Sequence, residues 1–472
     1  MYPTLRNCRV RGEEGDFYLQ NFKTGAEIVL DSMQAQVLHN CDGSLNSQEI
    51  AAFHQTTVSE LTEFMAGFEQ QGLLVMKELS EKLHFGELGH SPYLREVHCD
   101  ITGRCNLFGI CKHCYGRPVF QDLQTEELSL SEVDGLISQM ASWNVADCVL
   151  SGGEPLLRGD LPEIIGKLDD NAIRLTGIFT NGTVEREDVF EMLKSRQMRT
   201  FFFVSLDGAR SETNDFMRGP GSFEKTVGFI RRAIFSGFRV VVNTMVIQQN
   251  VEELVQMYTF LESLGVSTWR LSTPREQGDA ICNSELIMPE WPDVFSAYET
   301  LITRAMNGDD RIKIQVGSIF RTDMLQDKAL YLFTPASSCC EYKRWSLVVK
   351  PNGNIVPCSA FDNLVFGNIR EDNIGEVWES DTVQAFKNLP VSKTECASCE
   401  LLAYCGSGCR KIAYEIHGSI FAKDEQSCPV YEFARDVVVP MLTKHGICPE
   451  QLSDETGYTW DEKIIERCLQ RC

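Results

Sequence analysis

The chain has 472 residues, too many for one compact core, so we expect two to four domains. Asp and Glu number 67 against 44 Lys and Arg, and a formal net charge of −23 argues against a nucleic-acid partner. No apolar run of 18 residues occurs, and the first residues do not combine a charged segment with an apolar one. We therefore expect no membrane association, no export and a cytoplasmic location.

Residues 1–85 are expected to form a small α+β module. Two extended runs flank a turn, three helices open at capping residues, and a short strand returns. In chain order these are Asp16–Asn21, the turn Lys23–Gly25, Glu27–Leu30, helices opening after Asp31, Asn46 and Thr57, and the strand Leu73–Met76. Strand pairs combined with three short helices favour a winged-helix-like domain.

Residues 94–275 alternate between strands and helices, which predicts a parallel sheet, open or closed, in an α/β domain. In such a sheet the chemistry lies at the carboxyl ends of the strands, where the loops converge. The expected strands are Glu96–Ile101, Asp147–Ser151, Arg174–Thr180, Phe201–Ser205, Arg239–Val246 and Thr268–Ser272, with helices such as Ser131–Ser142 and Phe223–Ser236 between them.

The remaining chain divides into three parts. Residues 276–335 are expected to be a helical connector, with Trp291–Met306 as its clearest helix. Residues 336–435 are rich in Cys, Gly and Pro, and a segment that cannot build a large apolar core can be held together by metal. Residues 436–472 are expected to form a helical tail.

The chain contains 19 cysteines, and their clustering in a long chain favours metal ligation over disulfide bonds. Cys105, Cys111 and Cys114 directly follow the first strand of the alternating region. Three thiolates on one loop can hold three irons of a 4Fe–4S cluster and leave the fourth iron open for a substrate's amino and carboxylate groups. A structural zinc loop is the alternative.

Further motifs occupy the ends of the next three strands. Gly152, Gly153 and Glu154 follow the second strand, where the glycines permit close approach of the backbone and the carboxylate offers an acceptor to an ammonium group. A tight turn between strand and helix would explain the glycine pair equally well. Asn181 follows the third strand, and Ser205 and Asp207 lie at the end of the fourth.

The cysteine loop, Gly-Gly-Glu-Pro, Thr-Asn-Gly and Ser-Leu-Asp-Gly, in this order, resemble the radical S-adenosylmethionine (SAM) superfamily. The resemblance implies a partial (β/α)6 barrel, a SAM-binding 4Fe–4S cluster, and a 5′-deoxyadenosyl radical that abstracts a substrate hydrogen. It also implies a low-potential electron donor such as flavodoxin or ferredoxin. By this resemblance Cys105, Cys111 and Cys114 bind the cluster, Gly152, Gly153 and Glu154 contact the methionine moiety, Ser205 and Asp207 lie near the ribose or carboxylate, and Asn181 and Arg218 are further contacts.

One departure from the family pattern concerns the cysteine loop. The family spacing is C-x3-C-x2-C, whereas this sequence has C-x5-C-x2-C. Two additional residues before Cys111 are tolerable if Gly109 takes the required turn. Cys99 does not repair the spacing, and we interpret it as a buried thiol of the strand.

The cysteines of residues 336–435 resemble the SPASM domain, which holds two auxiliary iron–sulfur clusters in radical SAM peptide and protein maturases. A zinc ribbon is the alternative for the central four. With Cys339 or Cys340 in the proximal set, we expect three protein thiolates there and either an open iron or an unrecognised ligand. The resemblance implies Cys396, Cys399, Cys405 and Cys428 as ligands of the distal cluster, and Cys340 (or Cys339), Cys358 and Cys409 as ligands of the proximal one.

Residues 1–85 resemble the peptide-recognition element of enzymes that mature ribosomally made peptides. In that family a leader peptide adds a strand to the domain's sheet, so that main-chain hydrogen bonds supply affinity and side-chain pockets supply register. The alternative is a winged helix that serves dimerisation or acts as a scaffold.

We therefore expect a radical SAM maturase that abstracts a hydrogen from a precursor peptide and forms an intramolecular cross-link, first a thioether and next a carbon–carbon bond. An anaerobic sulfatase-type maturase that generates formylglycine is the alternative, although such enzymes carry an Asp where this chain has Ser359. A non-catalytic iron–sulfur carrier would need no SAM pocket. The sequence selects no general base; the polar residues near the motifs are Tyr115, Arg275, Tyr342, Asp362 and Tyr404, and no cluster role is expected for Cys448, Cys468 and Cys472.

Overall fold

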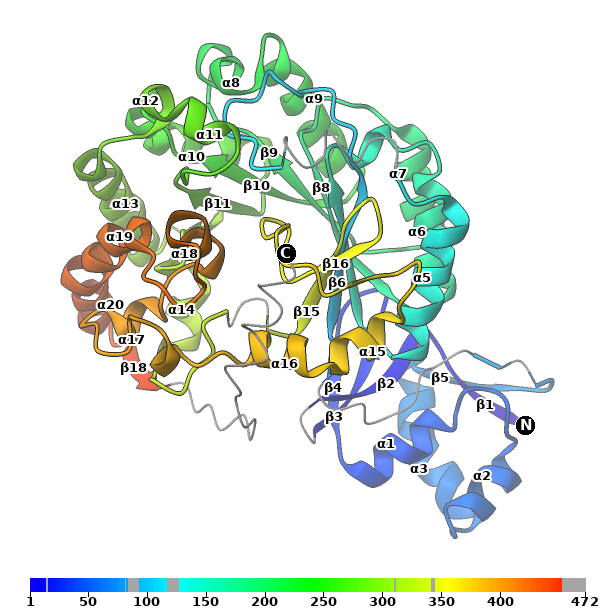
Figure 1. Cartoon of the computed structure of the whole chain (residues 1–472). Coiled ribbons are helices and arrows are strands. Elements are labelled where there is room, and N and C mark those ends of the chain that lie inside the picture. Colours follow the sequence, from blue (N-terminus) through cyan, green and yellow to red (C-terminus); the bar gives the residue numbers. More distant parts are fainter. Residues whose placement is uncertain are drawn as a thin grey trace.

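The computed structural model describes residues 1–13, 16–80, 82–83, 93–116, 127–309, 311–340 and 344–451. Tyr342, Cys468 and Cys472 lie outside the described residues. An N-terminal module lies below a curved sheet, and the C-terminal elements face the inner side of that sheet (Figure 1). Within the described ranges no helix is both long and apolar enough to cross a membrane.

The N-terminal module contains two small antiparallel sheets and three helices around its own apolar core. The predicted capping boxes at Asn46 and Thr57 are present, and the predicted N-cap Asp31 also forms a capping box. The predicted strands and helices are confirmed, whereas the two first strands were not predicted. The elements are β1 (Tyr2–Leu5), β2 (Cys8–Glu13), β3 (Asp16–Asn21), β4 (Glu27–Leu30), α1 (Ser32–His39), α2 (Ser47–Phe53), α3 (Val58–Gln70) and β5 (Leu74–Lys77), with β1 paired to β5 and the sheet order β2-β3-β4.

The central domain is the predicted α/β barrel, built from six parallel strands in chain order. Each strand lies within one residue of its predicted bounds. The strands are β6 (Glu96–Thr102), β7 (Asp147–Gly152), β8 (Arg174–Thr180), β9 (Phe201–Ser205), β10 (Arg239–Met245) and β11 (Thr268–Ser272); the helical elements are α5 (Leu130–Ser142), η1 (Pro155–Leu157), α6 (Leu161–Asp170), α7 (Glu187–Ser195), α8 (Ser211–Arg218), α9 (Ser222–Phe235), η2 (Val251–Glu253) and α10 (Leu254–Leu264).

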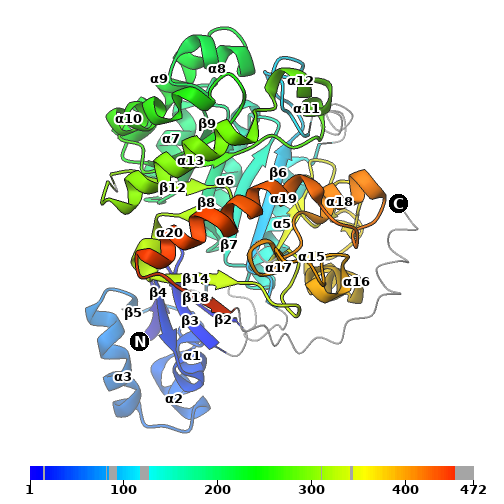
Figure 2. The ribbon, with the colours of Figure 1, turned by 90° about the vertical axis from the view of Figure 1, so that its left-hand side faces the viewer.

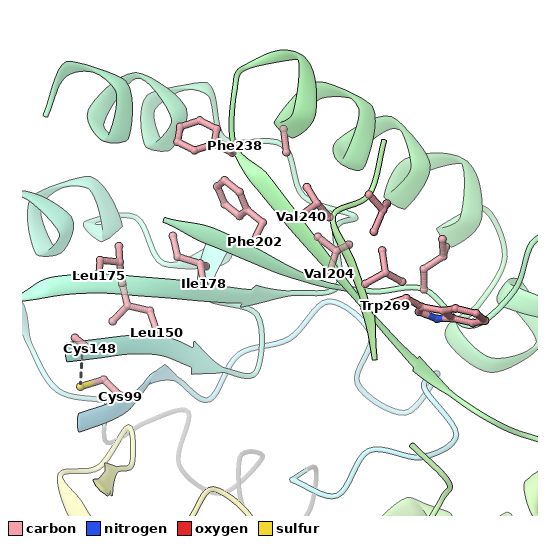
Figure 3. Packing of buried hydrophobic residues seen from close by; sticks show 14 of the residues in the cluster. Cys99, Cys148, Leu150, Leu175, Ile178, Phe202, Val204, Phe238, Val240 and Trp269 are labelled. Carbon is pink, nitrogen blue, oxygen red and sulfur yellow. Dashed lines mark hydrogen bonds between the residues drawn. The ribbon is translucent and has the colours of Figure 1, made fainter. Parts of the chain in front are cut away.

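Apolar side chains on the helix side of these strands form the main core (Figure 3). Phe202, Val204 and Trp269 point from β9 and β11 toward the helices, and all three are fully buried. Cys99 is buried as predicted, with its Sγ 3.9 Å from the Sγ of Cys148 on the neighbouring strand. Because side chains alternate along a strand, the residues between these point to the inner side of the barrel.

The connector is not purely helical, which differs from the helical connector that the sequence predicted. Lys313–Val316 is a strand, β12, which extends the sheet parallel to β11; its four residues are too few to show a period-two pattern clearly. The connector elements are α11 (Asp279–Cys282), α12 (Ser284–Ile287), α13 (Trp291–Met306), β12 (Lys313–Val316), β13 (Phe320–Arg321), α14 (Asp323–Asp327) and β14 (Ala329–Leu332).

The cysteine-rich segment continues the same sheet on its other side, because β15 pairs in parallel with β6. Its helical end lies across α13, where the rings of Phe433 and Phe295 stack at 4.5 Å (Figure 2). The tail is not wholly helical, since β18 pairs with β14 and carries the exposed Cys448. The elements are β15 (Ser346–Val349), β16 (Asn354–Val356), β17 (Gly367–Asn368), α15 (Ile374–Glu379), α16 (Asp381–Lys387), η4 (Val391–Lys393), α17 (Leu402–Cys405), α18 (Arg410–His417), η5 (Glu425–Ser427), α19 (Cys428–Phe433), the π-helical η6 (Ala434–Val438), α20 (Val439–Lys444) and β18 (Cys448–Gln451).

Candidate active site and cysteine groups

The motifs of the barrel meet at the carboxyl ends of four neighbouring strands. The cysteine loop follows β6, Gly152 closes β7, Thr180 closes β8 and Ser205 closes β9. These strands are parallel and adjacent in the order β6-β7-β8-β9, so their ends share one edge of the sheet. The predicted site residues of this region therefore face one common space.

The loop after β6 brings its three thiols together. Burial raises the pKa of the Cys105 thiol to about 12, and the charges of Cys114 and Cys111 add to this effect. Gly109 has a φ of +73°, the turn conformation that the longer loop requires. The additional residue Ile110 packs against Gly219, the residue that follows α8, so the altered spacing is absorbed without separating the thiols.

The two glycines after β7 allow the cysteine loop to lie directly against them. Gly153 N–H donates to the carbonyl of Thr102 at 2.8 Å, and the next N–H, of Glu154, donates to the carbonyl of Arg104 at 2.7 Å. A Cβ at Gly153 would lie 2.3 Å from that Arg104 oxygen, and one at Gly152 would lie 2.3 Å from the Thr102 oxygen. Both glycines are thus required for the close approach that positions Cys105.

Glu154 is fully buried and joins the ends of β7 and β8. Its Oε1 accepts from Thr180 Oγ1 at 2.8 Å and from Leu156 N at 3.1 Å, while Oε2 accepts from Asn181 N at 2.7 Å. Burial raises the pKa of Glu154 to about 7 against these three donors. The carboxylate therefore joins two strand ends within the protein, and the predicted contact with a ligand's ammonium group would come in addition to these three hydrogen bonds.

Asp207 and Arg218 form a buried ion pair behind the cysteine loop. Arg218 Nε donates to Asp207 Oδ2 at 2.6 Å, and Met245 N donates to Oδ1 at 2.7 Å. His113, which lies between two of the loop cysteines, is 3.7 Å from the same carboxylate. Burial would raise the pKa of Asp207, but Arg218 and His113 outweigh burial and hold it at about 2.

Asn181 contacts the cysteine loop from β8. Its Nδ2 donates to Asn106 Oδ1 at 3.0 Å and lies 3.9 Å from the Sγ of Cys105. Sequence reasoning did not identify His113 or Asn106, although both are polar residues inside the cysteine loop, and that position was the available signal. Ser205 lies in register with Asn243 of β10, on the inner side of the barrel.

A second group of cysteines surrounds a cavity of about 240 Å³ in the C-terminal segment. Burial raises the pKa of the Cys340 thiol, with Cys339, Cys409 and Cys358 adding to the effect, so these thiols lie close together. Lys387 and the guanidinium of Arg410 also line the cavity, and they supply positive charge beside a group of thiolates. The cavity is lined by Arg275, Ser318, Phe333, Cys339, Cys340, Pro357, Cys358, Phe361, Phe386, Lys387, Tyr404, Cys405, Gly408, Cys409, Arg410, Lys411, Ser427 and Tyr431.

The third group contains the four remaining cysteines of the segment. Burial raises the pKa of Cys405 to about 12, with Cys396 and Cys428 contributing, and the charge of Cys399 also acts on Cys396. In the described part of the chain no three Cys, His, Asp or Glu side chains could hold a single metal ion as they stand. The cysteines converge instead in larger groups, a donor set that fits multi-iron clusters with thiolate ligands.

Two ion-pair systems tie this segment to the barrel. Lys350, directly after β15, donates from Nζ to Asp100 Oδ2 on β6 at 3.0 Å and contacts Asp362 Oδ1 at 2.7 Å. On the other side Arg275, three residues after β11, donates from Nη1 to the buried Asp424 at 3.1 Å. The cysteine-rich segment is therefore anchored near both ends of the curved parallel sheet.

Comparison with protein families agrees with this geometry. Residues 100–261 match the Radical SAM superfamily, and residues 339–400 match SPASM, described as an iron-sulfur cluster-binding domain. The chain is a radical SAM enzyme with a SPASM domain. Its cofactors are S-adenosyl-L-methionine and 4Fe–4S clusters, which when bound supply the electron and the 5′-deoxyadenosyl radical of this enzyme class.

Several characterised proteins are similar to the barrel and the SPASM domain. An AdoMet-dependent heme synthase of Methanosarcina barkeri is 29% identical over 351 residues, which cover 71% of this chain and 96% of the relative. A PqqA peptide cyclase of Rhizobium meliloti is 27% identical over 330 residues, covering 69% of this chain and 84% of the relative.

Solved structures share the fold at low sequence identity. Streptococcus suis SuiB, bound to its precursor peptide SuiA, superposes with a TM-score of 0.63 at 16% identity and covers 90% of this chain and 99% of SuiB. The structure of anSMEcpe with AdoMet and the Kp18Cys peptide has a TM-score of 0.61 at 16% identity, covering 75% of this chain and 99% of anSMEcpe.

Proposed function

We propose that this enzyme matures a ribosomally made peptide: residues 1–85 bind the leader, and the barrel abstracts a hydrogen so that an intramolecular cross-link forms. The extent of the fold match with SuiB carries the proposal. Residues 86–472 make up only about 82% of the chain, so a match covering 90% must extend into residues 1–85. SuiB was solved bound to a precursor peptide.

The edge strand β4 supports leader binding by strand addition. In the described part of the module β4 pairs with β3 only, and its outer edge is unpaired. Val29 on this strand is 70% exposed, and Met33 of the adjoining α1 is 75% exposed. An extended peptide can form main-chain hydrogen bonds with such an edge while apolar side chains cover the exposed ones.

We assign the cluster ligands from the three cysteine groups. The loop thiols of Cys105, Cys111 and Cys114 would hold the SAM-binding cluster, beside the SAM contacts proposed above. The proximal auxiliary cluster would take Cys340, Cys358 and Cys409, with Cys339 adjoining it. The distal cluster would take the four thiols of the third group, Cys396, Cys399, Cys405 and Cys428. Flavodoxin or ferredoxin would supply electrons in the cytoplasm.

A thioether is the cross-link that we favour, with a carbon–carbon bond second. Three thiolates in the proximal group leave room for a substrate thiolate as a fourth ligand. For a thioether to form, the substrate would lose one C–H hydrogen atom, one thiol proton and one electron as the carbon–sulfur bond forms. The SAM-derived radical would accept the hydrogen atom, a base the proton, and the auxiliary clusters the electron.

A porphyrin-modifying activity is the second candidate, because the heme synthase is matched over 96% of its own length. The match leaves 29% of this chain without a counterpart, which a porphyrin substrate does not explain. Sulfatase-type formylglycine formation ranks third: anSMEcpe shares the fold over 75% of this chain, and Ser359 stands where a base is expected.

The decisive experiment uses the anaerobically reconstituted enzyme with SAM, dithionite and, as candidate substrates, short Cys-containing peptides encoded near its gene. We expect about twelve irons per chain, release of 5′-deoxyadenosine, and a peptide lighter by two hydrogen atoms. Val29→Asp should weaken peptide binding, whereas Val255→Asp, at a similarly apolar exposed position on α10, should not. Turnover triggered by Fe-coproporphyrin but not by the peptide would contradict the proposal and favour the second candidate.

A further inference from the structure

The inner side of the barrel carries a line of stacked aromatic rings that ends at a guanidinium. The ring of Phe179 on β8 lies 5.8 Å from that of His98 on β6, and the ring of Phe203 on β9 lies 4.5 Å from Phe179 with an interplanar angle of 13°. The Cζ of Arg270 on β11 lies 4.9 Å from the centre of the Phe203 ring. The line thus crosses the sheet from β6 to β11.

The position of Arg270 follows from strand alternation. Its neighbour Trp269 points into the helix-side core, together with Phe202 and Val204 (Figure 3). Arg270 and Phe203, the next residues along their strands, therefore point to the inner side of the barrel. The Arg270 residue as a whole is partly exposed, although its Nε is buried.

Arg270 has no acidic partner in the part of the chain that the structure describes. Among the residues that the structure describes, no carboxylate pairs with its guanidinium, and its buried Nε has no hydrogen-bond acceptor. Burial alone lowers its pKa, without any neighbouring negative charge to oppose the effect. Stacking on one phenylalanine compensates only part of the cost of desolvating a cation. Within the described ranges, the protein therefore supplies no anion to this guanidinium.

The residues in register with Arg270 on the neighbouring strands are polar. Ser205, Asn243, Arg270 and Gln315 are consecutive partners across β9, β10, β11 and β12. This row lies close to the strand ends that carry the active-site motifs, because Ser205 is the last residue of β9. On β10 and β11 only the pair Met245 and Ser272 lies between this row and the carboxyl end on the same face, so a polar group entering from that end can reach the row.

We propose that Arg270 is the receptor for a carboxylate of the substrate. A guanidinium presents two parallel N–H donors that match the two oxygens of a carboxylate. The methionine part of SAM is assigned to β7, which is four strands from β11, about 19 Å along the sheet. Ser205, the assigned SAM contact in the same row, is two strands away, about 10 Å, so Arg270 lies beyond the assigned SAM contacts on the side of β10 and β11. The inference rests on the proposed function for the peptide nature of the ligand, such as a Glu or Asp side chain.

The test compares two short probes, acetyl-Gly-Glu-Gly-amide and acetyl-Gly-Gln-Gly-amide, on the reconstituted enzyme with SAM bound, by saturation-transfer NMR. We expect the Glu probe to bind about tenfold more tightly than the Gln probe, the value of one charge-assisted pair. Arg270→Gln should abolish this preference, and Arg270→Lys should retain part of it. Arg239→Gln is the matched control, because Arg239, at the start of β10, also lies over a ring of β9, that of Phe201 at 5.7 Å, but is exposed.

Equal affinity of the two probes for the unmodified enzyme would overturn the inference, as would an unchanged preference in Arg270→Gln. A third result would also overturn it: if Arg270→Gln weakened binding of SAM but not of decarboxylated SAM, the guanidinium would serve the cofactor. None of these outcomes contradicts the proposed function, provided that the enzyme still removes two hydrogen atoms from its peptide. Absence of that mass change with an intact Glu preference would instead refute the proposed function alone.

Discussion

Replacing Lys350 by Met tests whether the ion pairs at the joint between barrel and SPASM domain stabilise it. The Lys350 side chain is 2% exposed and Asp100 is 0% exposed, so the variant leaves Asp100 and Asp362 as carboxylates without their shared ammonium. The carbonyl of Ser359, which accepts from the same ammonium at 2.8 Å, loses a donor as well.

Breaking a buried ion pair by removing one partner costs about 3–5 kcal/mol. Part of this cost is relieved, because burial already raises the pKa of Asp362. Lys350 is the main group that opposes this rise, with a smaller effect of Lys411, so without Lys350 that carboxyl can take up a proton more easily. We therefore expect Lys350→Met to lower the free energy of local opening of β15 from β6 by about 3 kcal/mol, the lower end of this range.

Hydrogen exchange measured by mass spectrometry reports this local free energy in the holoenzyme. Amides of β15 and β6 should exchange at least about 100-fold faster in Lys350→Met, since each 1.4 kcal/mol is a factor of ten. Lys313→Met is the matched control: Lys313 pairs with Asp323 on the surface, at 50% and 46% exposure, and its loss should change exchange by no more than about fivefold. Acceleration of less than about tenfold in Lys350→Met would refute the reasoning.

Two substitutions test the cysteine groups. Gly153→Ala should disrupt the SAM-binding loop, because the new Cβ would lie 2.3 Å from the Arg104 carbonyl. Release of 5′-deoxyadenosine should fall at least about tenfold. Gly159→Ala is the control: it has open space around it and should retain activity. Replacing Cys358 and Cys409 together by Ala should lower the iron content by about four per chain, and an unchanged iron content would remove both from the proximal cluster.

Local patterns in the sequence predicted the barrel well. Each of the six barrel strands combines apolar residues with a turn or a helix start beyond it, and the capping boxes at Asn46 and Thr57 specify helix starts within a few residues. Such signals depend on neighbours along the chain. The short strands β12 and β15 were not predicted, because a four-residue strand is recognised mainly by its pairing, and their partners lie 45 and 250 residues away in the registers Thr268↔Lys313 and Glu96↔Ser346.

In the candidate site, too, the sequence predicted the features that depend on local patterns and missed those that depend on distant residues. The sequence identified Glu154 as an acceptor for an ammonium group, but it could not show that three protein donors already occupy the carboxylate. Arg270 and Lys350 carry no motif, and each gains its meaning from strands that only the fold brings together. Residue type and spacing therefore indicate the chemistry of this site, whereas the partners of each side chain follow from topology.

The position of the N-terminal module sets a minimum length for the spacer between leader and cross-link in the proposed peptide substrate. The module contacts the amino ends of the barrel strands: the carboxylate of Glu27 lies 3.6 Å from Arg95, just before β6, and the Val10 carbonyl accepts from Asn144, just before β7, at 3.0 Å. The SAM motifs lie at the carboxyl ends. The seven residues of β8 separate the two ends by about 23 Å, so an extended peptide needs at least about seven residues between leader and cross-link. Precursors with stepwise shorter spacers should bind unchanged but lose modification below that length, and full modification at half of it would show that the leader binds elsewhere.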